Sequence, residues 1–389
     1  MENIEKERHT SWLENFYDLI VAIVVFQLSS ILNHNVSISG FLAFIALFIP
    51  VLWSWMGVTF YNTRFETDDL GHRLLTLLQM AAAAFMAVCV SDGFGKYSSG
   101  FALSYAATRA ILVIEYLRTG RNIPATRPLV KRYSIGFSVA AVLWFVSALV
   151  PTPFRFIFWI LGLIIDISTP MIFTRSMAVK FAPDIHHLPE RLGSFTIIVL
   201  GISILAVVDG ISSHDWTAQS ITDAALGLGI AFSLWWIYFD TVDGSEIKAL
   251  RSDRRVGIYL SWLYIHFPLL IGFTALGVSI EHVVLDNQNL AMPFAEKWLL
   301  CVSVSMCLFA LGIMHITSER TNQVRNNSLR KEFPILALYG IIAAVVVIIV
   351  AIPNEGLLPV FLMSAMAIAC GGQVALDVRR HPHHRLFKM

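Results

Sequence analysis

Charged residues are scarce in this chain. Lys, Arg, Asp and Glu make up only 14% of its 389 residues, whereas hydrophobic residues make up 56%. A water-soluble protein of this length needs far more charge to stay dispersed, so the composition excludes that class. The net charge of +1 supplies no basic field for a nucleic acid, so no nucleic acid is expected as a partner.

Cysteines and cofactor motifs are equally sparse. The four cysteines all fall within hydrophobic segments, where they act as small apolar residues, so neither a disulfide framework nor a zinc site is expected. The chain has no glycine-rich nucleotide-binding loop and no metal-binding pattern of His and acidic residues. We therefore expect no cofactor, no metal and no use of ATP.

Long hydrophobic segments are what the chain has instead. Twelve of them approach or exceed the ~20 residues needed to cross about 30 Å of hydrocarbon. They lie at 12–33, 40–61, 72–91, 100–118, 134–150, 154–175, 191–209, 220–240, 256–280, 297–315, 333–352 and 356–377. The first is too long for a signal-peptide core and lacks a cleavage site, so we expect a retained helix. The sequence predicts an all-α, polytopic membrane protein with about 12 transmembrane helices.

Basic residues alternate between the loops that separate these segments. Of 28 Lys and Arg, 24 lie on the side that holds both termini, three (Lys96, Arg155 and Lys297) on the other, and Arg109 lies inside a segment. Lys and Arg close to a membrane span resist translocation, so the basic side is cytoplasmic. The pattern predicts a multi-pass protein of the cell membrane, surrounded by lipid, with both termini in the cytoplasm.

The even number of segments predicts two halves of six helices. We expect a cytoplasmic N-terminal tail at 1–11, a first half at 12–183, a second half at 184–378 and a basic cytoplasmic tail at 379–389. A parallel repeat is indicated by Leu52-Trp53-Ser54-Trp55 and Leu234-Trp235-Trp236, each followed by aromatic residues and an acidic turn. Trp residues also arise independently as anchors at the membrane interface, so that alternative stays open.

Several ionisable side chains fall inside the segments. An ionised group at the bilayer centre costs about 2.5–3.5 kcal/mol on insertion scales, so its presence needs a reason. The candidates for a polar pathway or for buried ion pairs are Glu14, Asp18, Arg109, Asp166 and His266. Asp18, Arg109 and Asp166 fall at similar depths in the cytoplasmic half, so we expect opposite charges among them to pair. Such pairing suits a structural salt bridge and a functional pathway equally well.

Glu14 and His266 have simpler explanations. Glu14 lies near the start of the first helix, where a carboxylate complements the helix dipole. His266 lies near the middle of the ninth segment, where a neutral hydrogen bond between helices is favoured over a proton relay.

A second set of charges is expected on the cytoplasmic side. The short loop after the second helix is dense in both signs, and further charges flank the seventh and eighth helices. The candidates for a packed charge network or gate are Arg64, Asp68, Asp69, Arg73, Glu190, Arg191 and Asp240. A solvated turn is the alternative for the loop.

Four motifs stand out along the chain. They are Trp12-Leu13-Glu14-Asn15-Phe16-Tyr17-Asp18-Leu19, Asn62-Thr63-Arg64-Phe65-Glu66-Thr67-Asp68-Asp69, Glu190-Arg191-Leu192-Gly193 through Gly201, and His266-Phe267-Pro268 with Glu281-His282. With them the chain resembles the low temperature requirement protein A (LtrA) family of bacterial membrane proteins. Glu66 stands where the family usually has Asp, and Ile202 where it usually has Glu. If that second carboxylate serves a shared ion pathway, this chain lacks it or uses another group. The family name records a cold-growth phenotype, so the resemblance implies a class and no mechanism.

These features predict a gradient-driven channel or secondary transporter of an ion or small solute. One alternative is a membrane-embedded enzyme or a lipid-headgroup-binding protein, in which Glu190, Arg191, Asp240 and the Arg64 loop would hold a phosphate. That hypothesis lacks a nucleophile or metal constellation, so we name no catalytic residue. Another alternative is a membrane sensor or assembly factor that transports nothing and is needed for growth in the cold. The sequence leaves the oligomeric state open, a homo-oligomer included.

Overall fold

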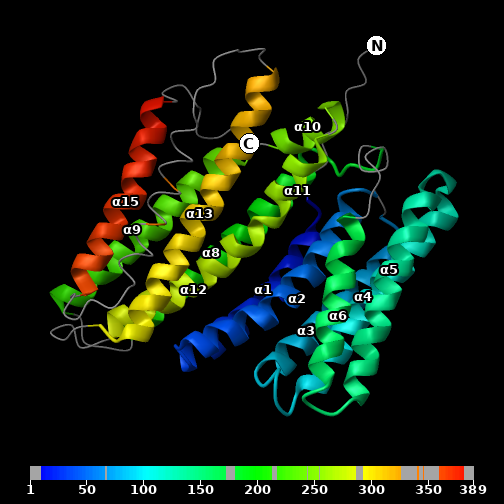
Figure 1. Cartoon of the computed structure of the whole chain (residues 1–389), viewed down its shortest axis with the longest axis horizontal. Coiled ribbons are helices and arrows are strands. Elements are labelled where there is room, and N and C mark those ends of the chain that lie inside the picture. The colour runs from blue at the N-terminus through cyan, green and yellow to red at the C-terminus, as the bar shows by residue number, and fades with distance from the viewer. Residues whose placement is uncertain are drawn as a thin grey trace. The chain divides into compact units, whose positions relative to one another are not determined.

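A computed structural model describes residues 10–65, 68–171, 180–212, 217–242, 244–253, 255–285, 292–325, 340, 345 and 359–380. Within these residues every regular element is a helix (Figure 1). Ten helical segments there are long and apolar enough to cross a membrane. The expectation of an all-α chain with many membrane spans is therefore confirmed.

Two of the twelve predicted segments are not among the ten. In the sixth, α6 (Arg155–Ser168) ends after 14 residues and a 3-10 turn (Thr169–Met171) follows. Pro170 explains the end of α6, because it lacks an N–H and its ring clashes with the carbonyl of Asp166. The rest of that segment, nearly all of 333–352 and most of both terminal tails lie outside the described residues.

The chain divides into two compact units, each described by itself. Unit 1 consists of Met1–Leu28, Ile45–Phe195 and Leu250–Val256, and unit 2 of Ser29–Phe44, Thr196–Ala249 and Gly257–Met389. The boundaries between the units at residues 28/29, 44/45 and 195/196 fall inside long helices and not at their ends. The two six-helix halves at 12–183 and 184–378 stay a prediction.

Unit 1 contains parts of α1 (Trp12–His34) and α2 (Ile38–Asn62), followed by α3 (Leu70–Val90), α4 (Ser98–Asn122), α5 (Arg127–Leu149) and α6. From α3 to α6, each helix packs against the next in the chain. The fifth helix begins at Arg127 rather than at the predicted 134, because Pro128 in its first turn suits a helix start.

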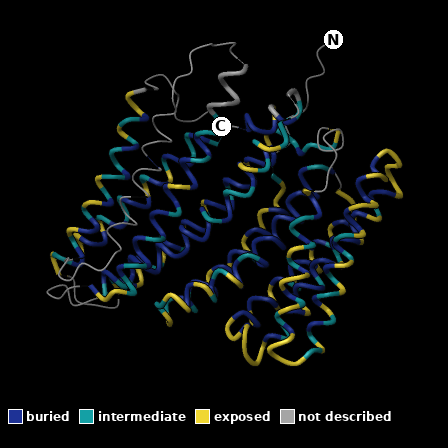
Figure 2. The backbone as a smooth tube through the Cα atoms, viewed as in Figure 1, coloured by how far each residue is buried: buried dark blue, intermediate teal, exposed yellow. Residues whose placement is uncertain are grey.

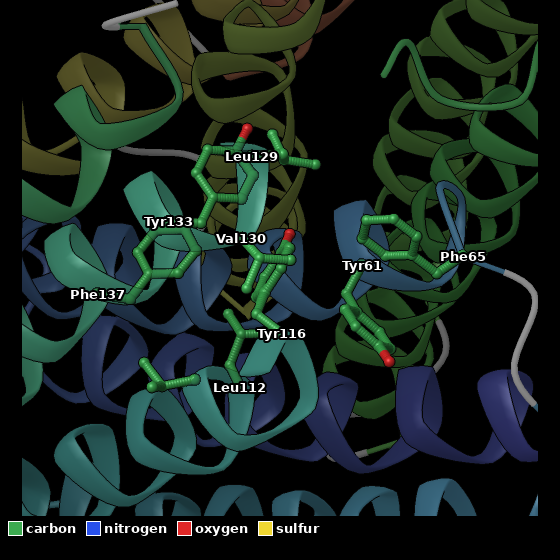
Figure 3. Packing of buried hydrophobic residues seen from close by; sticks show 9 residues of the cluster. Tyr61, Phe65, Leu112, Tyr116, Leu129, Val130, Tyr133 and Phe137 are labelled. Atoms are coloured by element: carbon green, nitrogen blue, oxygen red, sulfur yellow. The ribbon is translucent and has the colours of Figure 1, made fainter. Parts of the chain in front are cut away.

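An aromatic core joins α2, α4 and α5 (Figure 3). Its buried members are Tyr61, Phe65, Leu112, Val113, Tyr116, Leu129, Val130, Tyr133 and Phe137. The Tyr116 ring lies 5.2 Å from that of Tyr61 and 5.1 Å from that of Tyr133, both edge to face. Edge-to-face pairs contribute about 0.5–1.5 kcal/mol beyond their buried area, so this core fixes α4 between its two neighbours.

Other faces of unit 1 remain apolar and exposed (yellow positions in Figure 2). On α3, Leu74, Leu78, Phe85 and Val88 are each more than half exposed. Such a continuous apolar face would be a liability in water, but it is the expected surface toward acyl chains.

Arg155, one of the three basic residues expected on the outer side, is buried at the end of α5. Its Nε donates to the carbonyls of Ser147 (2.9 Å) and Val150 (3.1 Å), and its Nη2 to that of Ala148 (3.2 Å). Its Nη1 contacts the Ser98 hydroxyl. The last carbonyls of a helix have no helical partner, so Arg155 caps α5.

Unit 2 contains most of α8 (His187–Ser212), then α9 (Ala218–Thr241), α12 (His266–Leu285), α13 (Phe294–Arg325) and α15 (Pro359–Arg380). Helix α12 is buried along nearly its whole length and packs against α9 and α13. Gly272 faces Cys307 and Gly277 faces the backbone of Ser203, so glycine lets neighbouring helices approach closely.

Two details of the region before α12 differ from the sequence expectation. The predicted segment 256–280 is divided into α11 (Val256–Tyr264) and α12, because the Pro268 ring clashes with the carbonyl of Tyr264. The preceding loop contains an unexpected helix, α10 (Ser245–Asp253). Ile247 and Leu250 on α10 are buried, and their three-residue spacing was the available signal.

Candidate functional site

The first buried charge cluster of unit 1 is centred on Arg109, and we call it the Arg109 cluster. It contains Arg109, Asp166, Tyr105 and the carbonyl of Trp53. Arg109 Nε lies 2.7 Å from Asp166 Oδ2, and both side chains are essentially inaccessible. The Tyr105 hydroxyl donates to the same oxygen at 2.5 Å, and Arg109 Nη2 donates to Trp53 O at 2.6 Å. One cation faces one anion, so the cluster is balanced in charge.

Helix geometry and a glycine make room for this cluster. Tyr105 and Arg109 are four residues apart on α4, so they share one face. A Cβ at Gly57 of α2 would overlap the Arg109 guanidinium, so a residue without a side chain is needed there. The Phe137 ring lies 5.7 Å from Arg109 Cζ and forms an aromatic wall. The cluster therefore ties α2, α4 and α6 together.

The second cluster lies where α1, α2 and the start of α8 meet, and we call it the Asp18 cluster. It contains Glu14, Asp18, Trp55, His187 and Arg191, all buried. Asp18 Oδ1 accepts from Arg191 Nη2 at 2.7 Å and from Trp55 Nε1 at 2.6 Å. Glu14 Oε2 lies 3.3 Å from His187 Nε2, and Glu14 Oε1 lies 4.0 Å from Arg191 Nη1.

A capping box fixes the α1 side of the Asp18 cluster. The Ser11 N–H donates to Glu14 Oε2 at 2.8 Å, and the Glu14 N–H donates to Ser11 Oγ at 3.3 Å. This reciprocal pattern starts a helix at a defined residue. Asp18 follows Glu14 by four residues, so both carboxylates lie on the same face of α1.

Asp184 fixes the α8 side. Its Oδ1 accepts from the N–H groups of His186 at 2.9 Å and His187 at 2.8 Å, so it caps the helix. Partial burial acts to raise the pKa of the Asp184 carboxyl, but these donors and the charge of Arg251 prevail and hold that pKa below its ordinary value. The capped first turn places His187 and Arg191, four residues apart, on the face toward α1.

Three hydrogen bonds hold the segment that leads into α8. Arg64 Nε donates to Phe181 O and Arg251 Nη2 donates to Pro183 O, each at 2.9 Å. The third bond runs from backbone to backbone, because the Asp184 N–H donates to Thr63 O at 2.9 Å. The motif after α2 therefore sets where α8 begins, and through it the α8 side of the cluster.

A sequence model of the family described as "Bacterial low temperature requirement A protein (LtrA)" matches residues 9–384. The chain belongs to this family. It is also similar to an uncharacterized protein of Rhizobium meliloti (strain 1021), with 27% identity over 318 residues and 74% of each chain covered. No solved structure matches the chain. Two LtrA motifs, the one at Trp12–Leu19 and the one that opens α8, meet in the Asp18 cluster.

The Asp18 cluster of this LtrA protein is not balanced in charge. Two carboxylates, Glu14 and Asp18, face one guanidinium, and His187 is charged only when it is protonated. Asp18 Oδ2, Glu14 Oε1, the Tyr17 hydroxyl and Arg191 Nε are buried and have no hydrogen-bond partner among the described residues. Buried polar atoms are nearly always hydrogen-bonded, so the cluster has hydrogen-bonding capacity that the described residues do not use.

The expectation that opposite charges among Asp18, Arg109 and Asp166 pair with each other is met by only one of the two carboxylates. Asp18 pairs with Arg191, whereas Arg109 pairs with Asp166. Arg191 is expected from the sequence in the cytoplasmic charge network, but it belongs to the buried first turns of α8 and reaches Asp18 there. Similar depth along two helices does not establish that they are lateral neighbours.

The seven residues expected to form one cytoplasmic network have different roles and partners. Asp68 pairs with Arg73 on the exposed surface, at 2.9 Å. Asp69 caps α3 by accepting from His72 N at 3.0 Å, and it also contacts Arg118. Of the other members, Arg64 binds the Phe181 carbonyl, Glu190 accepts from Thr10 N at 3.3 Å, and Asp240 lies in the last turn of α9.

Sequence reasoning missed three members of the clusters, namely Trp55, His187 and Tyr105. A signal for His187 was present, because its four-residue spacing to Arg191 matches the spacing of Glu14 to Asp18. Tyr105 stands in the same relation to Arg109. Trp55 enters the sequence argument only as part of a possible repeat, and nothing in its sequence context indicates a bond to Asp18.

His266 lies in unit 2 and joins helices there. Its ring is fully buried, with Nδ1 2.8 Å from Trp262 O and Nε2 3.3 Å from the Tyr238 hydroxyl. These contacts connect α12 with α11 and α9. Both ring nitrogens are engaged in hydrogen bonds, as a neutral structural histidine would be.

Proposed function

We propose that this LtrA protein is a gradient-driven channel or secondary transporter of an ion or small solute, and that its polar pathway passes the Asp18 cluster. The observation that carries the proposal is the unequal charge of that cluster. With His187 neutral, two carboxylates and one guanidinium leave one net negative charge inside a membrane-spanning region. Such a charge is costly to bury, and a bound cation or proton would remove the cost.

The Arg109 cluster supports this assignment by contrast. Its single cation and single anion neutralise each other, and Arg109 Nη2 also donates to the Trp53 carbonyl and the Tyr105 hydroxyl. A pair that is balanced in charge needs no bound ion to neutralise it. We assign Arg109 and Asp166 to holding helices together, and Asp18 with its neighbours to transport.

The proposal includes the topology that the sequence predicts: twelve spans in the cell membrane with both termini in the cytoplasm. The alternation of Lys and Arg supports that orientation. Arg155 is one of the three basic residues on the predicted outer side, and its role as the cap of α5 explains why it is there.

A parallel repeat is supported by polar contacts between the first two helices of each half, Asp18 with Trp55 and Thr196 with Tyr238.

Transport is tested with the purified full-length chain in liposomes. We expect flux of a proton, alkali ion or small solute under an imposed gradient, a strong loss of flux in Asp18→Asn and Glu14→Gln, and native flux in Asp68→Asn. The last variant is the matched control, because it makes the same chemical change in an exposed ion pair. Gel filtration and circular dichroism verify that each variant is folded.

Absence of flux under every gradient would remove the transport proposal. Turnover of phospholipid without flux would support the membrane-embedded enzyme, and neither activity would support the sensor or assembly factor. Native flux in folded Asp18→Asn and Glu14→Gln would leave transport in place and exclude the Asp18 cluster as its pathway.

A further inference from the structure

We infer that the ion handled by the Asp18 cluster is a proton, carried by the Glu14–His187 pair while Asp18 stays bound to Arg191. This inference rests on the proposed transport function and names its ion. It follows from three features of the cluster: the unequal anchoring of its two carboxylates, the ring nitrogens of His187, and a donor set that suits a proton better than a metal ion.

The two carboxylates are held very differently. Asp18 Oδ1 receives two short hydrogen bonds, from Arg191 at 2.7 Å and Trp55 at 2.6 Å. Glu14 is held less closely by side chains: Arg191 Nη1 is 4.0 Å away, His187 Nε2 is 3.3 Å away, and its one short bond comes from the Ser11 backbone at 2.8 Å. Glu14 is therefore the carboxylate that Arg191 holds less closely.

His187 is the natural partner of Glu14 in this exchange. Its Nε2 lies 3.3 Å from Glu14 Oε2, and the residue is fully buried. Apart from this contact with Glu14, the ring nitrogens have no hydrogen-bond partner within the described part of the chain. An imidazole carries a proton on one nitrogen and accepts another on the second, so this ring is free to take up a proton and share it with Glu14.

Charge and donor set select the proton over a metal ion. One added proton, on His187 or Glu14, makes the net charge of Glu14, Asp18, Arg191 and His187 zero. A metal cation would need several oxygen or nitrogen ligands, and it would be repelled by the Arg191 guanidinium. No group of three or more His, Cys, Asp or Glu able to hold a metal occurs in the residues that the structure describes. A proton needs only one lone pair.

Charged and titratable groups lie near His187 on several neighbouring elements. The charged or titratable groups are Glu14, Tyr17 and Asp18 of α1, Glu190 and Arg191 of α8, and Asp184 with Arg251 beside the start of α8. From α2 the Trp55 indole faces Asp18. Arg191 is the fixed cation closest to Glu14 and Asp18, so the cluster becomes neutral when one proton binds. The neutral form is the one that stays buried, and the form with one negative charge is the one that opens to water.

Proton flux tests the inference directly. The full-length chain is placed in liposomes loaded with pyranine, a pH gradient is imposed, and the membrane potential is clamped with potassium and valinomycin. We expect native and Asp68→Asn proteins to move protons, and His187→Gln and Glu14→Gln to lose proton flux by about tenfold or more. Movement of an alkali ion or solute without protons overturns the inference and keeps the transport proposal, whereas no movement of any kind overturns transport.

A second measurement does not depend on flux. Dicyclohexylcarbodiimide modifies protonated carboxyl groups in apolar surroundings, and mass spectrometry locates the adduct. In the detergent-purified native chain we expect the adduct on Glu14, increasing toward acid pH, and none on Asp18. An adduct on Asp18 instead of Glu14, or no adduct on either at any pH at which the protein stays folded, overturns the inference.

Discussion

Replacing Asp166 by asparagine tests whether the Arg109 cluster is a structural tie. The substitution keeps the shape of the side chain and removes its charge, which leaves the Arg109 guanidinium buried at 1% exposure with no anion. Breaking a buried ion pair by removing one partner costs about 3–5 kcal/mol. Since folded domains are stable by only about 5–15 kcal/mol, the variant should unfold far more readily than the native chain.

The matched variants separate charge from other effects. Arg109→Met combined with Asp166→Leu removes both charges and retains bulk, so its stability should return to within about 1 kcal/mol of native or exceed it. Asp68→Asn makes the same chemical change in the exposed pair with Arg73 and should leave the unfolding midpoint unchanged. Tyr105→Phe removes a hydroxyl that donates to a charged acceptor, at a cost of about 1.5–3 kcal/mol.

Unfolding in mixed micelles with increasing dodecyl sulfate, followed by tryptophan fluorescence, measures these differences. Trp144 and Trp159 are suitable reporters, because their rings stack at 4.9 Å and Trp144 packs on Tyr105. An Asp166→Asn midpoint equal to that of Asp68→Asn would refute the reasoning. So would a double variant that is as unstable as Asp166→Asn, because packing and not charge would then explain the loss.

Other single substitutions give further expectations. Gly57→Ala should cost about 1–3 kcal/mol in unfolding free energy because its Cβ overlaps Arg109, whereas Gly201→Ala, with open space around it, should be neutral or stabilising. Asp184→Ala should cost about 0.5–2 kcal/mol through the lost cap of α8. The low pKa of that carboxyl means that native stabilisation is full above about pH 4 and is lost as the pH falls further, so the native and alanine midpoints should converge in acid. Arg155→Met should lower the unfolding midpoint and increase amide hydrogen exchange at the end of α5, where native-like protection would disprove the cap.

Much of the fold could be predicted from the sequence because hydrophobic length is a local property. Each apolar segment must form its own backbone hydrogen bonds in lipid, so it is helical wherever it lies. Breaks were harder to place. Pro170 and Pro268 both interrupt predicted segments, but Pro50 lies inside α2 without ending it, because neighbouring helices decide whether a proline is tolerated.

The candidate site was less predictable because it depends on lateral packing. The depth of a residue in the membrane follows from its position along the helix. Equal depth correctly placed a possible partner of Arg109, Asp166, in the sixth helix. Which helices stand side by side does not follow from depth, so the sequence argument groups Asp18 with Arg109 and Asp166 and does not find its partner Arg191. Gly57 shows the same limit, since nothing in its local sequence indicates that a guanidinium occupies the space beside it.

The nearly complete enclosure of α12 has a consequence for biosynthesis. Ribosomes deliver α12 to the membrane before α13, one of the helices against which it packs, so α12 first meets lipid on a side that later meets protein. Its hydroxyls suit that interval, because Thr274 and Ser279 donate to carbonyls one turn earlier in the same helix, at 2.9 and 2.7 Å. Chains that stall after residue 285 should therefore remain inserted, yet they would present an unfinished surface to the quality-control proteases of the membrane.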